Sequence, residues 1–206
     1  MFKYLSFSHF FSKVQETHWY REFLTPVLDE ISFGASVLDI GTGSGKLLGL
    51  LRKLKEVHAT GIDTNQNMLD EAMLKVGSLG VALQKVEPGE KFPFKKNSFE
   101  YISLCNVLFN LSSEDALFLI SEALRVKTKE GKLIVLTPTG KENSQRSKKG
   151  SRPFETISFV IWFQATRKRA IQWSTSKLLI DFCKQNNLSY KSRIVFNGFA
   201  KLEIIE

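Results

Sequence analysis

The stretch Val37-Leu38-Asp39-Ile40-Gly41-Thr42-Gly43-Ser44-Gly45 joins a short apolar run to three glycines at alternate positions. Leucines recur at helical spacing after it, from Leu47 to Leu54. This order predicts a strand, a glycine turn and a helix. Because glycine lacks a Cβ atom, the turn lets the backbone approach a ligand closely, and the following helix directs its free N–H groups toward that ligand.

Two phosphate-binding motifs nearly match this stretch and then fail. The dinucleotide fingerprint requires a third glycine where the chain has Lys46. The P-loop requires glycine at position 40 and Ser or Thr at position 47, where the chain has Ile40 and Leu47. The sequence therefore predicts that neither phosphate cradle is intact.

Segments typical of strands and helices alternate along the remainder of the chain. Expected strands lie at 37–40, 58–63, 81–86, 99–105 and 132–137, and expected helices at 47–54, 68–76, 114–125 and 175–187. Strands separated by helices predict a parallel sheet, because only crossover connections join parallel neighbours. The final strands, 190–196 and 199–205, flank Asn197-Gly198, which favours a two-residue type I′ turn. The predicted fold class is α/β: a doubly wound, mostly parallel seven-stranded sheet with helices on both faces and a C-terminal antiparallel β-hairpin.

Length and composition place the chain among compact globular proteins. Its 206 residues are 43% apolar, which lets one domain bury a core without disulfide or metal staples. The longest uncharged stretch, Tyr101–Ser113, is shorter than the roughly 20 residues of a membrane-spanning helix, and no secretory signal is evident. Cys105 and Cys183 fit two reduced thiols, so we expect a cytoplasmic protein with no membrane partner. The net charge of +8 favours anionic partners without identifying one.

An acidic residue, Asp63, ends the second expected strand, where a carboxylate can accept both hydroxyls of a ribose. Further motifs follow along the chain: Gly61-Ile62-Asp63, Phe92-Pro93-Phe94, Asn97-Ser98-Phe99-Glu100, Glu122-Ala123-Leu124-Arg125-Val126 and Gly131-Lys132-Leu133. With these motifs and the glycine stretch, the chain resembles the class I S-adenosylmethionine-dependent methyltransferases, particularly the methyltransferase type 11 domain branch, over about Val37–Pro138. The resemblance implies a Rossmann-like methyltransferase fold, S-adenosyl-L-methionine as cofactor and methylation of an acceptor.

The resemblance also implies roles around the cofactor. Gly41, Gly43 and Gly45 are expected to line its methionine end, Asp39 to lie near its amino group, and Asp63 to bind its ribose. The full expected cofactor-binding set is Asp39, Gly41, Thr42, Gly43, Gly45, Asp63, Thr64, Met68, Glu87 and Cys105. Plainer alternatives stay open: the glycines only make a tight turn, Met68 is a core residue rather than a neighbour of the adenine, and Cys105 is a small buried apolar side chain. No metal site is expected.

The chain departs from the family pattern in places that bear on the site. Pro88 stands where the family usually has an acidic residue that binds the adenine amino group. Either neighbouring Glu87 or backbone groups substitute for it, or the cofactor is bound more weakly. Phe109-Asn110-Leu111 replaces a frequent His-His-Leu, which removes a histidine base. Lys129-Glu130-Gly131 replaces Pro-Gly-Gly and is expected to affect only a turn.

Methyl transfer from a sulfonium is an in-line displacement in which the protein mainly aligns the reacting atoms, so no catalytic side chain is obligatory. The candidate catalytic residues are His18, Tyr20 and Asn106. His18 and Tyr20 lie in an N-terminal segment that folds over the cofactor in similar proteins; the alternative is a helix whose aromatic residues pack on the sheet. Asn106 follows the strand at 99–105, at the edge where ligands bind in open α/β sheets.

We expect one methyltransferase domain, 1–206, with four parts. These are an N-terminal helical lid region (1–35), a cofactor-binding core (36–138), a basic loop with a substrate-side helix (139–173), and a C-terminal helix and hairpin (174–206). The aromatic residues within 154–170 either roof an acceptor pocket or form the ordinary core face of a helix.

The favoured function is transfer of a methyl group to an unidentified small-molecule acceptor. A nucleic-acid acceptor is a variant of this hypothesis, motivated by the basic residues between 141 and 152. A regulatory module that binds the cofactor or a nucleoside without turnover is the alternative from another class, motivated by the missing adenine-binding acid and the missing histidine. The oligomeric state does not follow from the sequence.

Overall fold

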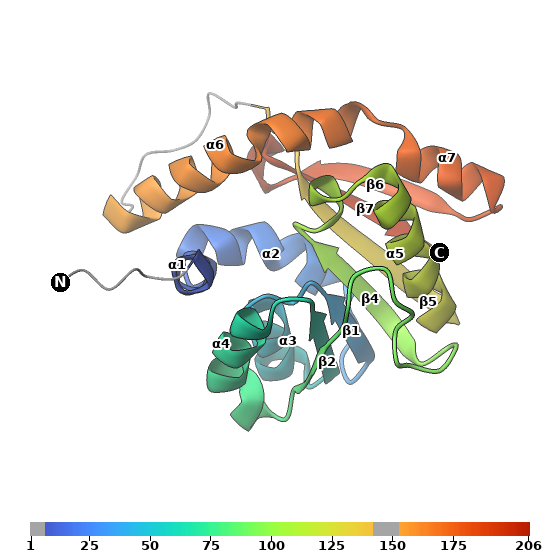
Figure 1. Ribbon diagram of the computed structural model, residues 1–206, viewed down its shortest axis with the longest axis horizontal. Coiled ribbons are helices and arrows are strands. Elements are labelled where there is room, and N and C mark those ends of the chain that lie inside the picture. Colours follow the sequence, from blue (N-terminus) through green and yellow to red (C-terminus); the bar gives the residue numbers. More distant parts are fainter. Residues whose placement is uncertain (1–6, 142–152) are drawn as a thin grey trace.

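The computed structural model describes residues 7–141 and 153–206. Within them, helices cover both faces of one seven-stranded sheet (Figure 1). The strands are β1 (Ser36–Ile40), β2 (His58–Asp63), β3 (Ala82–Lys85), β4 (Phe99–Cys105), β5 (Lys127–Pro138), β6 (Tyr190–Val195) and β7 (Ala200–Ile205). The α-helices are α1 (Phe7–Gln15), α2 (His18–Glu30), α3 (Lys46–Lys55), α4 (Gln66–Val76), α5 (Ser113–Val126), α6 (Pro153–Thr175) and α7 (Leu178–Gln185). The short 3-10 helices are η1 (Gly77–Leu79), η2 (Leu108–Asn110) and η3 (Phe196–Gly198).

The strand order is β3-β2-β1-β4-β5-β7-β6. The first five strands are parallel, and β7 runs antiparallel to both β5 and β6. The chain reverses its direction of winding between β1 and β4, and such a switch point opens a crevice at the carboxyl ends of the strands. In the register, Asp39 of β1 lies between Gly61 of β2 and Ser103 of β4. The predicted doubly wound sheet with its C-terminal hairpin is confirmed.

Successive side chains of a strand point to opposite faces of the sheet, so alternate residues belong to two hydrophobic cores, one on each face. Val37, Ile134 and Leu202 pack with residues of α2, α3, α4 and α6 on one face. Leu38 and Leu133 pack with α5 and α7 on the other. Because both faces are covered, the central strands are apolar almost throughout, as expected for parallel strands.

The connection between β6 and β7 is longer than predicted. A turn with left-handed residues does form at Asn197-Gly198, closed by the Phe199 N–H, which donates to the Phe196 carbonyl at 3.0 Å. The ladder, however, ends at Val195 paired with Ala200, so four residues rather than two lie in the connection. Phe199 is buried and Phe196 packs beside it against the core, which draws both residues off the ladder.

Other boundaries also differ from the predictions. α6 continues to Thr175, so α7 begins only at Leu178. β5 begins at Lys127 rather than 132, through a bulge opposite Phe99 and Tyr101. The buried Lys127 amine supports this bulge by donating to the carbonyls of Thr128 and Gly131 at 3.1 and 2.8 Å, and burial lowers its pKa. Residues 142–152, which include most of the predicted basic loop, lie outside the described part of the chain. None of the described helices combines the length and apolar character needed to cross a membrane.

Candidate active site

The turn after β1 requires glycine at three positions. Gly41, Gly43 and Gly45 have φ values of 71°, 57° and 76°, a left-handed conformation that other residues adopt at a cost. Neighbouring side chains also leave no room for a Cβ. A Cβ on Gly41 would lie 2.6 Å from Val107 Cγ2, and one on Gly45 would lie 2.8 Å from Val76 Cγ2. The turn is therefore both tight and closely packed.

The backbone N–H groups of this turn are all hydrogen-bonded within the protein. Those of Gly41 and Thr42 donate to the Ile62 carbonyl at 2.8 and 3.0 Å, Gly43 to Asp63 Oδ2 at 2.9 Å, Ser44 to Gln15 Oε1 at 3.0 Å, and Gly45 to the Thr42 carbonyl at 3.0 Å. A bound phosphate would need several of these donors. This geometry agrees with the prediction that neither phosphate-binding motif is intact.

Asp63 stands at the end of β2, beside the glycine turn. Its Oδ1 accepts from the Asn65 N–H at 2.9 Å, as Oδ2 does from Gly43. Asn65 in turn caps α4, because its side chain accepts from the Asn67 N–H at 3.0 Å. The carboxylate is half-buried, and each oxygen keeps lone pairs beyond its single bond. It is thus held rigidly and suits two neighbouring hydroxyl groups.

Asp39 lies at the switch point itself and is buried. Ser103 Oγ donates to its Oδ1 at 2.6 Å. Burial raises the pKa of Asp39 to about 6, against the lowering effect of this hydrogen bond, and the charge of Asp63 adds to the rise. A positively charged group at this place would favour the ionised form of Asp39. The site is therefore suited to a cationic ligand group.

The N-terminal helices bring further polar groups to the turn. Tyr20 is buried on α2, and its hydroxyl accepts from Gln15 Nε2 at 3.2 Å and from Asn106 Nδ2 at 3.5 Å. Burial raises the pKa of Tyr20, so this phenol is protonated at neutral pH. Gln15, Tyr20 and Asn106 thus form one chain of hydrogen bonds from α1 to the end of β4. Gln15 was not predicted from the sequence, because no motif surrounds it.

Asn106 Oδ1, near the turn, is buried and has no hydrogen-bond partner among the described residues. The Thr42 hydroxyl also lacks a close partner there, although it lies near enough to the Asp39 carboxyl to act on its pKa, in the lowering direction. Asn106 also has a φ of 61°, unusual for a residue other than glycine. Unsatisfied buried polar atoms are uncommon and suggest a missing partner. With Asp39 and Asp63, they give this crevice the acceptors that amino and hydroxyl groups of a ligand require. The residues present therefore fit a nucleoside with a cationic tail.

Several predicted site residues lie away from this cluster. The His18 side chain is 76% exposed and pairs with Glu22 at 3.3 Å. Glu87 is exposed and pairs with Lys85. Thr64 is exposed next to Asp63. The structure thus brings neither His18 nor Glu87 into contact with the glycine turn.

Met68 and Cys105 do lie near the cluster. Met68 is buried on α4, with Cε 3.3 Å from the position that a Cβ on Gly43 would take. Cys105 ends β4 beside Asn106. Burial raises the pKa of its thiol well above the ordinary value, and the charge of Asp39 adds to the effect. Cys105 is therefore a neutral thiol rather than a thiolate.

The aromatic residues of α6 divide between core and surface. Phe159, Trp162 and Phe163 are buried; Trp19 packs edge-on against Phe159 with ring centroids 5.3 Å apart. Trp19 Nε1 also donates to Ser158 Oγ at 3.0 Å. For these residues the structure shows core packing. Phe154, at the start of the same helix, is exposed.

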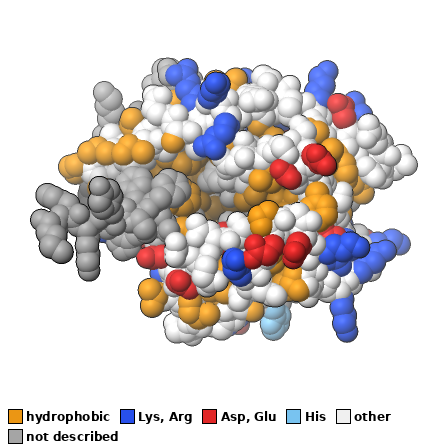
Figure 2. All heavy atoms as spheres, in the orientation of Figure 1, with side chains coloured by type: hydrophobic (Ala, Val, Ile, Leu, Met, Phe, Trp, Pro, Cys, Tyr) orange, Lys and Arg blue, Asp and Glu red, His pale blue; other side chains and the backbone are white. Residues whose placement is uncertain are grey.

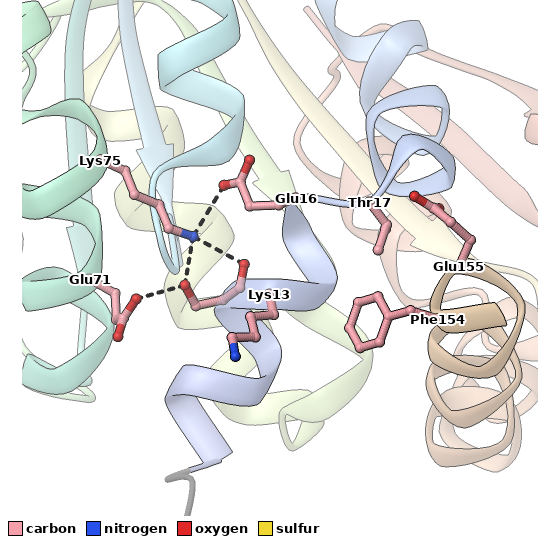
Figure 3. Close-up of a pocket in the computed structure, with 8 residues that line it drawn as sticks. Lys13, Glu16, Thr17, Glu71, Lys75, Phe154 and Glu155 are labelled. Carbon is pink, nitrogen blue, oxygen red and sulfur yellow. Dashed lines mark hydrogen bonds and ion pairs between the residues drawn. The ribbon is translucent and has the colours of Figure 1, made fainter. Parts of the chain in front are cut away.

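A cavity of about 490 Å³ lies where α1, α4 and the start of α6 meet (Figure 3). Its walls are Ser12, Lys13, Glu16, Thr17, Glu71, Lys75, Phe154 and Glu155. The face shown in Figure 2 is hollowed near its middle, with hydrophobic side chains in the hollow and charged side chains around it. No group of three or more His, Cys, Asp or Glu side chains in the described parts of the chain is arranged to hold a metal ion.

Comparison with known proteins agrees with this geometry. Residues 37–131 match a family model described as a methyltransferase domain. No curated protein matches the chain. Among solved structures, it is similar to a SAM-dependent methyltransferase from Aquifex aeolicus, with 22% identity, a TM-score of 0.66, and 94% of this chain and 96% of that chain covered.

Two further structures show the same likeness. The PH0226 protein from Pyrococcus horikoshii has 18% identity and a TM-score of 0.69, with 100% of this chain and 99% of that chain covered. A TehB-like SAM-dependent methyltransferase from Corynebacterium glutamicum has 13% identity and a TM-score of 0.59, with 95% and 97% covered. At these identities the likeness shows a shared fold over nearly the whole chain.

Proposed function

We propose that this chain transfers a methyl group from S-adenosylmethionine to a small-molecule acceptor. The proposal is supported by the match of residues 37–131 to a methyltransferase domain and by the fold, which is that of the class I S-adenosylmethionine-dependent methyltransferases. When bound, the cofactor supplies an electrophilic methyl group on a sulfonium. The side chains and backbone around the glycine turn have the task of binding and alignment.

The observation that carries the proposal is the position of Asp63. Its carboxylate is fixed by the Gly43 and Asn65 N–H groups, with lone pairs left for the two ribose hydroxyls. Asp39 suits the amino group at the other end of the cofactor, because a cation there relieves the cost of ionising a buried carboxyl. The unsatisfied Asn106 Oδ1 is available to either the cofactor or the acceptor.

The cavity beside α1 has the size of a small-molecule site, but neither the glycine turn nor Asp39 or Asp63 lines it, so it does not place the acceptor. Cavities that hold small molecules typically measure about 300–1,000 Å³, and this one measures about 490 Å³. Phe154 gives one of its walls an aromatic surface, while Lys13 and Glu155 add charged groups. We assign no catalytic base: the buried Tyr20 is held protonated, and alignment of the reacting atoms supplies much of the rate.

Calorimetric titration with S-adenosylhomocysteine tests the cofactor site. The wild-type protein should bind, and Asp63→Ala should weaken binding more than about tenfold through loss of hydrogen bonds to a charged group. Gly43→Val should also weaken binding, because valine does not tolerate the left-handed backbone. Asp70→Ala, which removes an exposed carboxylate on the neighbouring α4, is the matched control and should bind normally. Wild-type affinity in both Asp63→Ala and Gly43→Val would refute the site assignment.

Two further measurements separate the alternative functions. A structure with bound S-adenosylhomocysteine should show a solvent-connected space in front of its sulfur; a sealed space would favour a regulatory module without turnover. RNA and DNA binding should be measured at low and high salt. Steeply salt-dependent binding would point to a nucleic-acid acceptor instead of a small molecule.

A further inference from the structure

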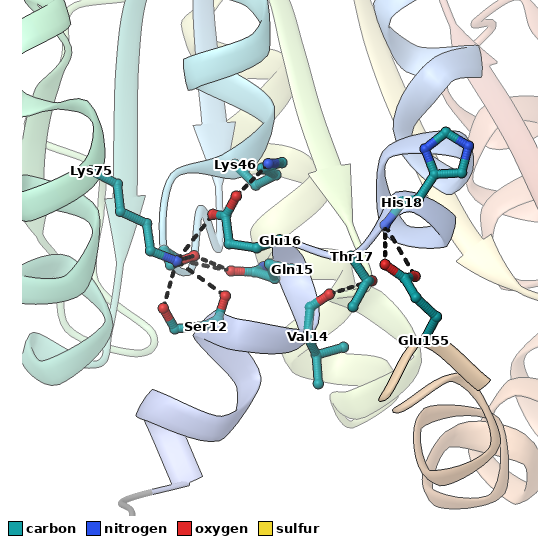
Figure 4. A network of polar contacts seen from close by, with 10 residues as sticks. Ser12, Val14, Gln15, Glu16, Thr17, His18, Lys46, Lys75 and Glu155 are labelled. Carbon is teal, nitrogen blue, oxygen red and sulfur yellow. Dashed lines mark hydrogen bonds and ion pairs between the residues drawn. The ribbon is translucent and has the colours of Figure 1, made fainter. Parts of the chain in front are cut away.

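α1 is fastened by polar contacts to α3 and α4 (Figure 4). Lys75 Nζ donates to the Ser12 carbonyl at 3.0 Å, to Ser12 Oγ at 2.6 Å and to Glu16 Oε1 at 3.1 Å, and it also donates to Ser44 Oγ of the glycine turn at 3.1 Å. Lys46, at the start of α3, pairs with the same carboxylate. Burial acts to raise the pKa of Glu16, but the hydrogen bonds from Lys46 and Lys75 outweigh it and the pKa is lowered. Glu16 is therefore ionised at neutral pH and holds both lysines.

Gln15, the last residue of α1, reaches from this fastened helix to the glycine turn. Its Oε1 accepts from the Ser44 N–H at 3.0 Å and from Ser44 Oγ at 2.6 Å. Its Nε2 lies 2.9 Å from the position that a Cβ on Gly43 would take. The side chain is buried. Gln15 thus fills the space directly over Gly43, where the turn lacks side chains of its own.

The contact with Gln15 differs from the other hydrogen bonds of the turn. In the described structure, the N–H groups of residues 41, 42, 43 and 45 donate to Ile62, Asp63 or Thr42, all within the β1-turn-β2 unit. Ser44 alone donates to a residue from the N-terminal helices. Movement of α1 would therefore free the Ser44 donors and uncover Gly43 without disturbing the rest of the turn.

We infer that Gln15 competes with the methionine end of the cofactor, and that α1 is an autoinhibitory closure over the glycine turn. The inference rests on the proposed function, because it concerns the same crevice. In the closed arrangement, the Gln15 amide supplies an acceptor for both Ser44 donors and occupies the space over Gly43. The amino acid end of the cofactor requires that space, so α1 and Gln15 must shift before it is seated.

The consequence for affinity follows from mass action. If only a fraction of the molecules has α1 shifted, the apparent dissociation constant equals the intrinsic one divided by that fraction. Removing the Gln15 amide, or releasing α1 from Lys75, raises the fraction and tightens binding. A residue that instead contacts the bound cofactor would give the opposite result, since its removal weakens binding.

The test measures S-adenosylhomocysteine binding by calorimetry in Gln15→Ala and Lys75→Met. Gln15→Ala should bind about three- to tenfold more tightly than the wild-type protein, a change that corresponds to the net free energy of about one hydrogen bond. Lys75→Met leaves Gln15 in place but also removes the Lys75 hydrogen bond to Ser44 Oγ, so Glu16→Gln, whose side chain contacts Lys46 and Lys75 rather than the turn, is measured beside it. Both variants should shift affinity in the same direction, and Glu16→Gln provides the test if Gln15→Ala does not fold. Gln164→Ala, at an exposed position on α6, is the matched control and should bind like the wild type.

Amide hydrogen exchange gives a readout independent of affinity. Addition of S-adenosylhomocysteine to the wild-type protein should speed exchange in residues 11–15, because α1 leaves the turn. Unchanged or weaker binding by Gln15→Ala, or slower exchange in α1 on ligand addition, would overturn the inference while leaving the cofactor site intact. Absence of binding by the wild type and by every variant would instead contradict the proposed function itself.

Discussion

Asp63 Oδ2 accepts a hydrogen bond from the Gly43 N–H at 2.9 Å, so the carboxylate that ends β2 also holds the turn that follows β1. Its second oxygen holds the Asn65 N–H at the same distance. Asp63 is thus both the candidate ribose ligand and a structural link between two strand ends. Its two roles are separable by experiment.

Asp63→Asn should separate binding from stability. The amide keeps one oxygen acceptor, so one of the two backbone N–H groups stays bonded and the free energy of unfolding should fall by only about 1–2 kcal/mol. Affinity for S-adenosylhomocysteine should fall more than tenfold, because an amide cannot accept from both ribose hydroxyls. Urea unfolding and calorimetry on the same samples provide the two values, with Asp70→Asn as control. An unchanged affinity would show that Asp63 is structural only.

Asp39→Asn should stabilise the protein at neutral pH. The folded-state pKa of Asp39 is raised from 3.8 to about 6, so the fold disfavours the charged form, and stability is lost as the pH rises between these values. At pH 8 the full cost is about 3 kcal/mol, and the asparagine variant removes it. The gain should shrink toward zero as the pH falls from 6 to 4. Urea unfolding across this range tests the prediction.

The exposed Asp29 supplies the control for this series. Asp29→Asn removes the same charge from the surface of α2 and should show no comparable dependence on pH. A gain from Asp39→Asn that stays constant from pH 4 to 8 would mean that Asp39 is not titrating near 6. Such a result would also weaken its assignment to a cationic ligand group.

Gly34→Ala and Gly45→Ala compare two glycines with nearly the same backbone. Gly34 has a φ of 72° and open space around its missing Cβ, while Gly45 has a φ of 76° and Val76 in the way. Gly34→Ala should cost about 1 kcal/mol, the penalty of the left-handed conformation. Gly45→Ala should cost about 2–4 kcal/mol, because crowding adds to that penalty. Equal losses in thermal or urea unfolding would contradict the role assigned to packing.

Arg125 should stabilise the segment before β4 through its planar guanidinium group, whose N–H groups form a fork that bonds several acceptors at once. It donates to the carbonyls of Phe92 and Phe94 at 3.0 and 2.8 Å and pairs with Glu122 at 2.7 Å. Arg125→Met should lower the free energy of unfolding by about 2–4 kcal/mol, because it also leaves the buried Glu122 carboxylate without its cationic partner, with only the Phe92 N–H of the described residues still donating to it. Arg125→Lys should recover only part of the loss, since an ammonium cannot reproduce the fork.

The contribution of Arg125 should also depend on pH. Hydrogen bonding from Arg125 lowers the pKa of Glu122, so the stabilisation is present above the unfolded-state pKa of glutamate and is lost as the pH falls. The difference between wild type and Arg125→Met should therefore shrink below about pH 4.5. Lys184→Met, at an exposed position on α7, is the control. A difference that does not change with pH would argue against the ion pair.

The sequence predicted those parts of the fold that depend on local pattern. The glycine stretch, the apolar strand segments and their helical separators determine the parallel sheet. Asp63 ends β2 and Asp39 lies one residue before the end of β1, as the pattern predicted, while their roles in binding stay predictions. The length of the last connection was not predicted, because the burial of Phe196 and Phe199 overrides the turn preference of Asn197-Gly198. Local propensity gives way there to packing between distant segments.

The remaining parts of the candidate site depend on contacts between distant residues. Gln15 meets Ser44 across 29 positions, and Tyr20 meets Asn106 across 86, and neither pair belongs to a motif. His18 was predicted as a catalytic candidate because of its residue type, but its position on α2 directs the imidazole toward Glu22 and solvent. Residue type alone carries no information about which face of a helix a side chain occupies.

The place of β7 has a consequence for the newly made chain. β7 lies directly beside β5, although α6, α7 and β6 are synthesised between them. Until residue 200 and those after it leave the ribosome, the β5 edge that carries Leu133 to Pro138 has no partner along its backbone. A nascent or truncated chain thus presents an open, apolar strand edge, the kind of surface that chaperones shield and that seeds aggregation.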